Sequence, residues 1–262
     1  NAEFLEAALK AAVSAGNLIE ERHKDILNVS RKESLRDIVT HVDKLAENQI
    51  IDILKDYDKN IPILTEESGL VQGKTEKTYW IVDALDGTVN YVNHIPFYAV
   101  SIALFDKNKI TVGVIFNPYS NELYYGSDGL GVFKNQKPMK IIDKVPEECL
   151  FSMAFSGKNY EATKRVDEFL LFGKINDSSR GCLRTGSAAM NLAYLAEGKF
   201  GGCLGKANKI WDVAAGLLLA KLAGSNVQFK EVDKEKNLVN YIATIPKAWN
   251  LISSNIRGIY QV

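Results

Sequence analysis

Apolar side chains recur every three or four positions in two stretches near the start of the chain. The first stretch covers residues 3–23, and the second covers residues 42–57. This spacing places the apolar side chains on one face of a helix, so it predicts two amphipathic helices. The segment between them, residues 28–40, is polar, and we expect it to be a mobile loop.

Beyond the second helix, the pattern changes to short apolar runs separated by turn residues. These runs predict β-strands at residues 61–64, 79–82, 98–105, 110–116 and 122–125. Two connecting segments, residues 106–109 and 117–121, are rich in Asn, Asp, Ser and Pro, which favour tight turns. Tight turns join antiparallel strands, so we expect an antiparallel sheet packed under the first two helices.

After about residue 146, strand and helix patterns are mixed. The predicted elements are a strand at 150–155, helices at 161–172 and 187–197, a strand at 200–204 and a helix at 213–222. This order favours a second, α/β half packed on the first. We therefore predict an α/β (α+β) protein with halves at residues 1–146 and 147–262, joined in one compact unit.

Composition narrows the function classes. The chain has 262 residues with 32 basic and 32 acidic side chains, so it can bury a large core and has no net charge. A neutral chain argues against direct nucleic-acid binding. Its apolar runs are far shorter than the roughly 18–20 residues of a membrane span. Without a visible signal peptide we expect a cytoplasmic protein, in which Cys149, Cys182 and Cys203 are buried, reduced thiols.

Residues 80–88 carry the clearest chemical signal in the chain. An apolar strand stops at Asp83, Asp86 follows three residues later, and Gly87 and Thr88 come next. Mg²⁺ prefers oxygen ligands, and two aspartates around a strand end can face one point. Gly87 lets the backbone approach an anion, and a helix beginning near Thr88 would favour phosphate at its N-terminus.

Two other segments place acidic residues next to an apolar strand or helix. Glu66 and Glu67 follow a strand, and Asp212 precedes an apolar helical run. Taken alone, the glutamates fit a solvated loop and Asp212 fits a helix N-cap. Asp83 is harder to explain without a ligand, because an acid at the end of a buried strand is costly unless it is paired or bound to a metal. Together the three segments predict one acidic metal cluster.

These motifs resemble those of the inositol monophosphatase family. The matching segments are residues 37–43, 66–67, 83–88, 96–103, 129–133, 186–189 and 211–212, so the resemblance covers nearly the whole chain. It implies a Mg²⁺-dependent, Li⁺-inhibited phosphatase that acts on a small phosphorylated substrate and forms a homodimer. It also implies the layered α-β-α-β-α sandwich of the inositol monophosphatase and fructose-1,6-bisphosphatase type.

The resemblance assigns roles to particular residues. It implies two to three Mg²⁺ ions, held by Glu66, Asp83 and the Leu85 carbonyl at the first ion and by Asp83, Asp86 and Asp212 at the second. Thr88 and Asp43 would orient the attacking water. Glu67 would hold a metal-binding side chain in place without binding the metal itself. From the residues alone, Thr88 also fits a helix cap, and Asp43 fits a helix N-cap or first-turn acid.

The resemblance also predicts where the substrate binds. Asp86, Gly87 and Thr88 would lie beside the phosphate, and Lys32 would reach the site from its loop. Gly186, Ser187 and Ala188 open a helix that would face the substrate hydroxyls. These small residues fit close helix packing equally well, and a lysine in a polar loop equally fits solvent exposure.

Two positions depart from the family pattern. Ala84 replaces a proline, and Gly205 replaces a glutamate that binds ring hydroxyls in the inositol-specific enzymes. Lys206 and Lys209 follow Gly205 and would suit a second anion on the substrate. The substrate therefore stays open between inositol 1-phosphate or a similar phosphorylated alcohol and a bisphosphate, such as fructose 1,6-bisphosphate or adenosine 3′,5′-bisphosphate. A further alternative is a partner-binding regulatory protein whose hydrolase activity is dispensable.

Overall fold

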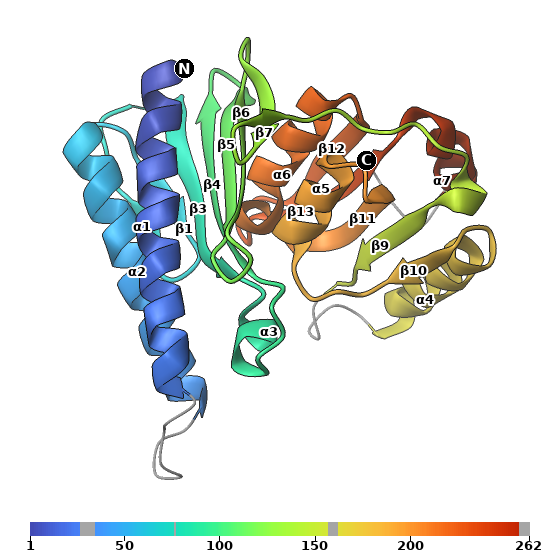
Figure 1. Cartoon of the computed structure of the whole chain (residues 1–262), viewed down its shortest axis with the longest axis horizontal. Helices are drawn as coiled ribbons and strands as arrows, with labels where there is room; N and C mark the ends of the chain where they lie inside the picture. The colour runs from blue at the N-terminus through green and yellow to red at the C-terminus, as the bar shows by residue number, and fades with distance from the viewer. Residues whose placement is uncertain (27–34, 76, 157–161, 257–262) are drawn as a thin grey trace.

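A computed structural model describes residues 1–26, 35–75, 77–156 and 162–256 of the chain (Figure 1). Two long helices at the start, α1 (Ala2–Ile26) and α2 (Leu35–Tyr57), pack on one face of the first sheet. Helix α2 begins earlier than the predicted residue 42, because apolar positions 35, 38 and 39 continue its helical spacing. Residues 35–40 of the predicted loop therefore belong to α2, and its residues 28–34 lie outside the part of the chain that the structure describes.

The first sheet has eight strands in the order β2-β1-β3-β4-β5-β6-β7-β8. Their bounds are β1 (Ile63–Thr65), β2 (Gly69–Val71), β3 (Thr78–Asp86), β4 (Ala99–Asp106), β5 (Lys109–Asn117), β6 (Glu122–Ser127), β7 (Gly131–Lys134) and β8 (Lys137–Pro138). Only β1 and β3 pair in parallel; the other neighbours are antiparallel, as the turn residues predict.

The second sheet has five strands in the order β10-β9-β11-β13-β12. Its strands are β9 (Leu150–Ala154), β10 (Gly181–Leu183), β11 (Phe200–Lys209), β12 (Asn226–Asp233) and β13 (Leu238–Thr244). The remaining α-helices of the described residues are α3 (Thr88–Val92), α4 (Ala162–Asp177), α5 (Ala188–Ala196), α6 (Ile210–Ala223) and α7 (Trp249–Asn255). The predicted domain boundary at residue 146 falls between β8 and β9.

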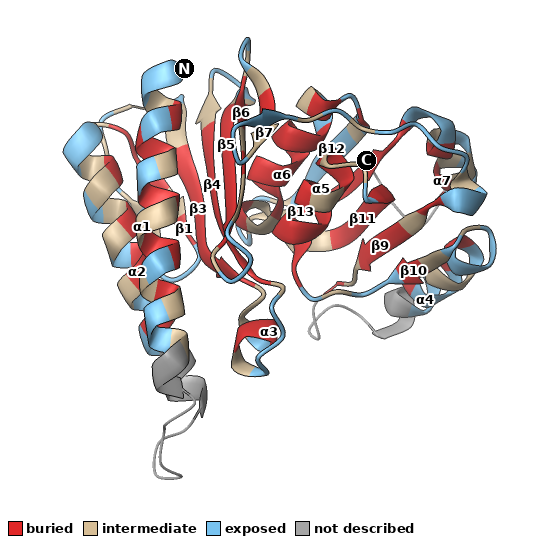
Figure 2. Cartoon of the chain, viewed as in Figure 1, coloured by how far each residue is buried: buried red, intermediate tan, exposed pale blue. Residues whose placement is uncertain are grey.

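Helices α5 and α6 form the central layer between the two sheets, and α4 lies against β9 and β10 on the other side of the second sheet (Figure 1). Both central helices are buried over almost their whole length (Figure 2). Close approach requires glycine here: a Cβ on Gly113 of β5 would lie 2.9 Å from the Ala215 carbonyl oxygen of α6. The layers therefore alternate helix, sheet, helix, sheet, helix, which confirms the predicted α-β-α-β-α architecture.

The described part of the chain contains no helix both long and apolar enough to cross a membrane. All three cysteines are buried and form no disulfide. Burial raises the pKa of both Cys182 and Cys203 to about 12, so these thiols stay protonated near neutral pH. Their environment fits the predicted role as packing residues.

Candidate metal centre and active site

An irregularity in β3 positions the two aspartates of the central motif. Asp83 pairs with Ser101 of β4 and Asp86 pairs with Ala99, so three steps on β3 match two steps on β4. In a regular strand, side chains three residues apart point to opposite faces, and the extra residue of a bulge corrects this. The strand therefore continues to Asp86, beyond its predicted end at residue 82, and both carboxylates are buried.

The chain turns sharply after Asp86. Gly87 has a φ of +91°, and a Cβ at this position would lie 3.0 Å from the Phe97 carbonyl oxygen, so only glycine fits. Helix α3 begins at Thr88, as the motif predicts. Thr88 Oγ1 donates a hydrogen bond to the Leu85 carbonyl at 3.0 Å, which ties the helix start to the predicted metal-binding carbonyl.

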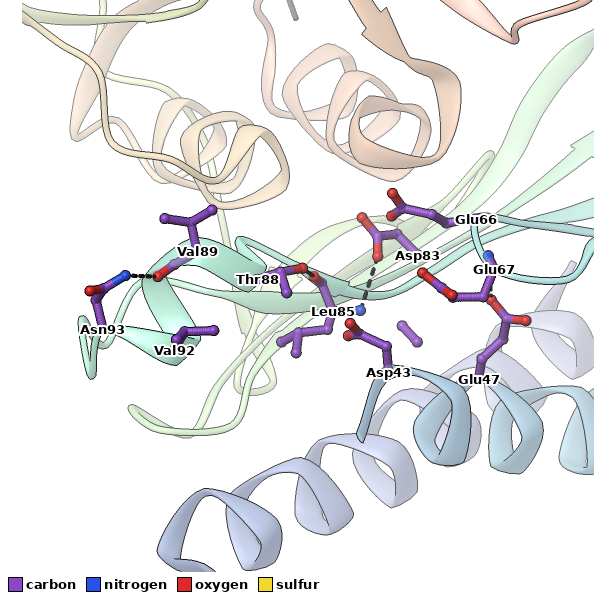
Figure 3. A pocket seen from close by; sticks show the side chains of 11 residues that line it. Asp43, Glu47, Glu66, Glu67, Asp83, Leu85, Thr88, Val89, Val92 and Asn93 are labelled. Carbon is purple, nitrogen blue, oxygen red and sulfur yellow. Dashed lines mark hydrogen bonds between the residues drawn. The ribbon is translucent and has the colours of Figure 1, made fainter. Parts of the chain in front are cut away.

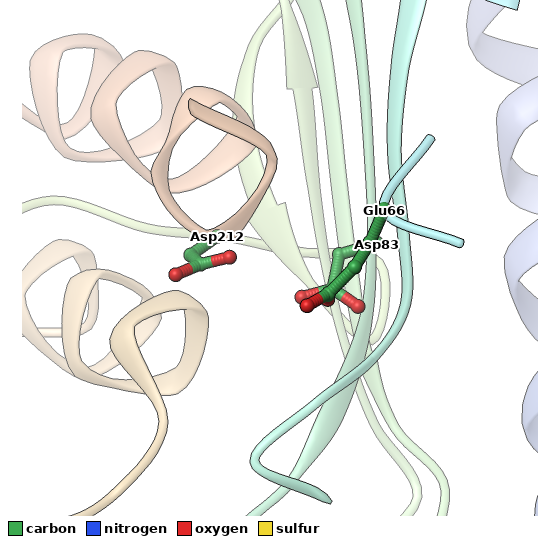
Figure 4. A group of neighbouring side chains, drawn as sticks. All are labelled: Glu66, Asp83 and Asp212. Carbon is green, nitrogen blue, oxygen red and sulfur yellow. The ribbon is translucent and has the colours of Figure 1, made fainter. Parts of the chain in front are cut away.

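Glu66, Asp83 and Asp212 form the acidic cluster of the structure. One carboxylate oxygen from each lies within 4.8 Å of the others, and the three face a common space (Figure 4). Glu66 follows β1, Asp83 lies on β3 and Asp212 lies in the first turn of α6. The sequence pattern placed Asp212 just before a helix. In the structure α6 begins at Ile210, so Asp212 lies inside its first turn. The three predicted acidic segments therefore converge.

Asp86 differs from the other predicted ligands because it binds a helix of the central layer. Its Oδ2 accepts hydrogen bonds from Ser187 Oγ at 2.5 Å and from the backbone N–H of Ala189 at 2.8 Å. Ser187 is the N-cap of α5 and also accepts the Met190 N–H. Burial raises the Asp86 pKa to about 6, although these hydrogen bonds oppose the shift. Asp86 thus joins the first sheet to α5 through one carboxylate oxygen.

The cluster is strongly acidic, with Asp83 buried, Asp212 partly buried and Glu66 exposed. Burial raises the pKa of Asp83 and of Asp212 well above the usual range, and the neighbouring carboxylates add to both shifts. For Glu66, burial and Glu67 raise the pKa, whereas Lys209 and the Trp211 indole lower it. Like charges this close stay ionised together only when a cation neutralises them. An all-oxygen donor set of this kind fits a hard divalent cation such as Mg²⁺.

A pocket of about 440 Å³ opens beside the cluster (Figure 3). Asp43 and Glu47 reach it from α2, and Glu66, Asp83 and Thr88 reach it from the first sheet and α3. Sequence reasoning missed Glu47. Its helical spacing from Asp43, four residues apart on one face of α2, was the available signal.

Asp43 and Thr88 both line this pocket. The Thr88 hydroxyl donates its hydrogen bond to the Leu85 carbonyl and not to the Asp43 carboxyl. Burial, followed by the charges of Glu67, Glu66 and Glu47, raises the Asp43 pKa to about 8. The Asp43 carboxyl therefore holds its proton more tightly than an ordinary aspartate does.

A second pocket, of about 150 Å³, lies on the other side of the cluster. Asp86 and Asp212 line it together with the predicted segment at residues 186–188. The turn before that segment is tight, since Gly186 has a φ of +93° and a Cβ there would lie 2.8 Å from Asn90 Oδ1. Arg184 and Asn208 also line this pocket, and sequence reasoning named neither.

The basic residues predicted at the substrate site lie in different environments. Lys206 is only 7% exposed and lines neither pocket. Lys209 donates to the Lys236 carbonyl at 2.9 Å, and its Nζ lies 5.0 Å from the centre of the Trp211 ring. Neither lysine lines the described pockets, although the positive charge of Lys209 acts on Glu66 and Asp212. Lys32 lies outside the described residues.

The chain belongs to the inositol monophosphatase family, whose model matches residues 1–242. It is 34% identical to the Nus factor SuhB of Escherichia coli K12 over 258 residues, which cover 97% of this chain and 96% of that protein. The inositol monophosphatase of Anabaena has a similar structure, with a TM-score of 0.83, 29% identity and coverage of 97% and 95% of the two chains. The extragenic suppressor protein suhB of Bartonella henselae matches equally well, with a TM-score of 0.83 and 29% identity over 97% and 98% of the chains.

Proposed function

We propose that this protein is a Mg²⁺-dependent phosphomonoesterase that hydrolyses a small phosphorylated alcohol in the manner of inositol-1-monophosphatase. The observation that carries the proposal is the convergence of Glu66, Asp83 and Asp212 between two pockets. Family membership supports a phosphatase fold. The Anabaena relative, named an inositol monophosphatase, supports the same reaction class.

The proposed ligands are those implied by the family motifs. Glu66, Asp83 and the Leu85 carbonyl would hold one Mg²⁺, and Asp83, Asp86 and Asp212 would hold another, with a third ion weakly held near Glu66. Bound in this way, Mg²⁺ supplies a nucleophilic water and neutralises the phosphoryl group. Asp86 lines the smaller pocket beside Asp212, although its Oδ2 is hydrogen-bonded to α5.

The other residues would position the reactants. Thr88 and Asp43 would orient the water, which requires Asp43 to lose its proton when cations enter the site and lower its pKa. Gly87 allows the phosphate to approach the backbone at the start of α3. Glu67 is held by Glu47 and would support the ligand shell, while residues 186–188 would face the leaving group.

The test is a phosphate-release screen over phosphomonoesters and bisphosphates with Mg²⁺. It should include inositol 1-phosphate, fructose 1,6-bisphosphate and adenosine 3′,5′-bisphosphate. We expect turnover that the Asp83→Asn variant lacks and that Asp52→Asn, a charge change at an exposed site on α2, retains. Absence of phosphate release from every ester would overturn the proposal.

A second candidate is a regulatory role in which the hydrolase activity is dispensable. The relatives named Nus factor SuhB favour it, because that name describes a factor and not a hydrolase. A pulldown compared between wild type and Asp83→Asn separates the two ideas. Partner capture that is equal for both proteins, together with no phosphate release by wild type, would favour the regulatory role.

We also propose a homodimer, which analytical ultracentrifugation would test.

A further inference from the structure

Two of the chain's three histidines meet where the end of helix α1 approaches helix α3 (Figure 1). His23 lies in the last turn of α1, and His94 follows Asn93, the C-cap residue of α3. His94 Nδ1 lies 3.0 Å from His23 Nε2, so the two rings share a hydrogen bond, and their tautomers decide which nitrogen donates it. Two ring nitrogens from distant parts of the chain are thus brought together at an exposed position.

Neighbouring residues hold this pair in place. The His23 ring packs on Tyr91, with the ring centroids 4.7 Å apart, and meets Tyr98 edge to face at 5.9 Å. Tyr98 in turn donates a hydrogen bond to Glu20, one turn earlier on α1. His94 has a φ of +56°, and its backbone N–H donates to the Tyr91 carbonyl at 3.2 Å. The His23 ring and the His94 backbone are therefore positioned by contacts other than the hydrogen bond between the two rings.

The separation of the two nitrogens also suits a metal ion. Imidazole nitrogens bind a metal at about 2.0–2.1 Å, so two of them are about 2.9 Å apart when bound at a right angle and about 3.4 Å apart in a tetrahedral site. The observed 3.0 Å is close to the right-angle value, which is typical of Ni²⁺ and Cu²⁺. The rings would turn toward the ion, and the proton between them would move to the far nitrogen of the ring that held it.

The surrounding charge favours a cation at this position. Helices α1 and α3 both end beside the pair, and the C-terminal end of a helix carries a partial negative charge. Among the described residues, no carboxylate, thiol or further imidazole completes a group of three ligands with His23 and His94. Water would therefore fill the other coordination positions, which fits an exchangeable ion better than a permanently bound one.

We propose that His23 Nε2 and His94 Nδ1 bind a divalent transition-metal ion such as Ni²⁺ or Cu²⁺, at a site separate from the acidic cluster. Imidazole suits these ions, whereas Mg²⁺ prefers oxygen, so the two sites take different metals. The ion would tie the end of α1 to the segment after α3. Because Thr88, Val89 and Val92 of α3 line the larger pocket, the ion would also steady one wall of that pocket.

The test is a calorimetric titration of the full chain, without an affinity tag, with Ni²⁺ in excess Mg²⁺. It compares wild type with His23→Gln, His94→Asn and the double variant. Glutamine keeps a good helix former at position 23, and asparagine tolerates the positive φ at position 94. The third histidine, His41, is exposed on α2, so His41→Gln is the matched control. Asp83→Asn alters the acidic cluster and shows whether Ni²⁺ binds there.

We expect wild type to bind one Ni²⁺ that each single histidine variant binds at least about tenfold more weakly, because losing a ligand should cost no less than losing a residue that supports one. The double variant should lose little more than either single variant, since both nitrogens hold the same ion. Ni²⁺ should raise the melting temperature of wild type more than that of either variant. With Cu²⁺, electron paramagnetic resonance should detect two bound nitrogens in wild type and fewer in the variants.

The controls separate this site from other sources of binding. His41→Gln and Asp83→Asn should both match wild type. Equal Ni²⁺ affinity in wild type and both variants of the pair would overturn the proposal, and so would a loss confined to Asp83→Asn. An equal loss in His41→Gln would show unspecific binding by histidines and would also overturn it. Melting curves without Ni²⁺ show that each variant is folded. Because no measurement uses phosphate release, the result is independent of the proposed phosphatase function.

Discussion

The Glu47 carboxylate accepts the backbone N–H of Glu67 at 3.0 Å, and its other oxygen accepts the N–H of Ser68 at the same distance. Glu47 is almost fully buried on α2, and the turn that it binds carries Glu66. A helix of the outer layer therefore fixes the position of a predicted metal ligand through a neighbouring backbone.

Replacing Glu47 by Gln should loosen this turn, because an amide NH₂ group cannot accept the second N–H. We expect a loss of about 1–3 kcal/mol in the free energy of unfolding and a higher Mg²⁺ concentration for half-maximal activity. Chemical denaturation and Mg²⁺ titration of activity would measure these effects. The exposed Asp52→Asn on the same helix should change neither. Lost stability with an unchanged Mg²⁺ requirement would limit Glu47 to a structural role.

The second prediction concerns the cluster itself. Asp83→Asn or Asp212→Asn should each lower kcat by far more than tenfold, which corresponds to about 1.4 kcal/mol of activation free energy. The same changes should raise the melting temperature of the metal-free protein, because they remove a buried charge from a group of like charges. Steady-state kinetics and thermal melts in chelator would measure both. A variant that keeps more than about a tenth of wild-type kcat would exclude that residue as a ligand.

The third prediction is a pH dependence of stability without divalent cations. Burial and neighbouring carboxylates raise the Asp43 pKa from 3.8 to about 8, so the folded state binds the proton more tightly than the unfolded state. Stability should therefore be highest below the unfolded pKa and fall as pH rises through the window from 3.8 to about 8.

Asp83 and Asp212 shift in the same direction and add to this slope. Thermal melts in chelator across this range would measure it. Asp43→Asn should make the slope shallower, whereas an identical slope in the variant would show that Asp43 does not titrate as described.

The fourth prediction concerns the metal requirement. Because the cluster offers only carboxylate and carbonyl oxygens, activity should require Mg²⁺, with Mn²⁺ as a partial substitute. Family resemblance further predicts inhibition by Li⁺. Phosphate release in chelator, with each cation added back separately, provides the measurement. Full activity in excess chelator would exclude the metal-based mechanism.

Periodicity predicted the elements that bury one clear face. Helices α1 and α2 have such patterns, whereas the strands β3 to β5 are buried on both faces and were predicted from their continuous apolar runs; the bounds differ from the predicted ones mainly at the ends. Strands β12 and β13 were not predicted. β12 is an edge strand whose side chains are mostly exposed and include Lys230, Glu231 and Asp233, so its sequence resembles that of a solvated loop. Its hydrogen bonds come from pairing with β13.

The residues of the candidate site, too, were only partly predicted from the sequence. The acidic residues at 66, 83 and 212 follow strand or helix boundaries that a sequence reveals, and the structure brings them together. Glu47 acts through hydrogen bonds to residues 20 and 21 positions away in the sequence, which no local pattern encodes. Lys206 was predicted to meet a second anion at the mouth of the pocket, whereas it is buried within the irregular stretch of β11.

The distribution of the acidic cluster along the chain has a consequence for protein synthesis. Glu66 and Asp83 leave the ribosome with the first sheet, but Asp212 follows only after most of the second half has been made. Until then the two early carboxylates lack their third neighbour, and Asp86 lacks the α5 N-terminus that binds it. A nascent or truncated chain therefore cannot assemble the cluster, so the full acidic site arises only in a chain whose two halves have already docked.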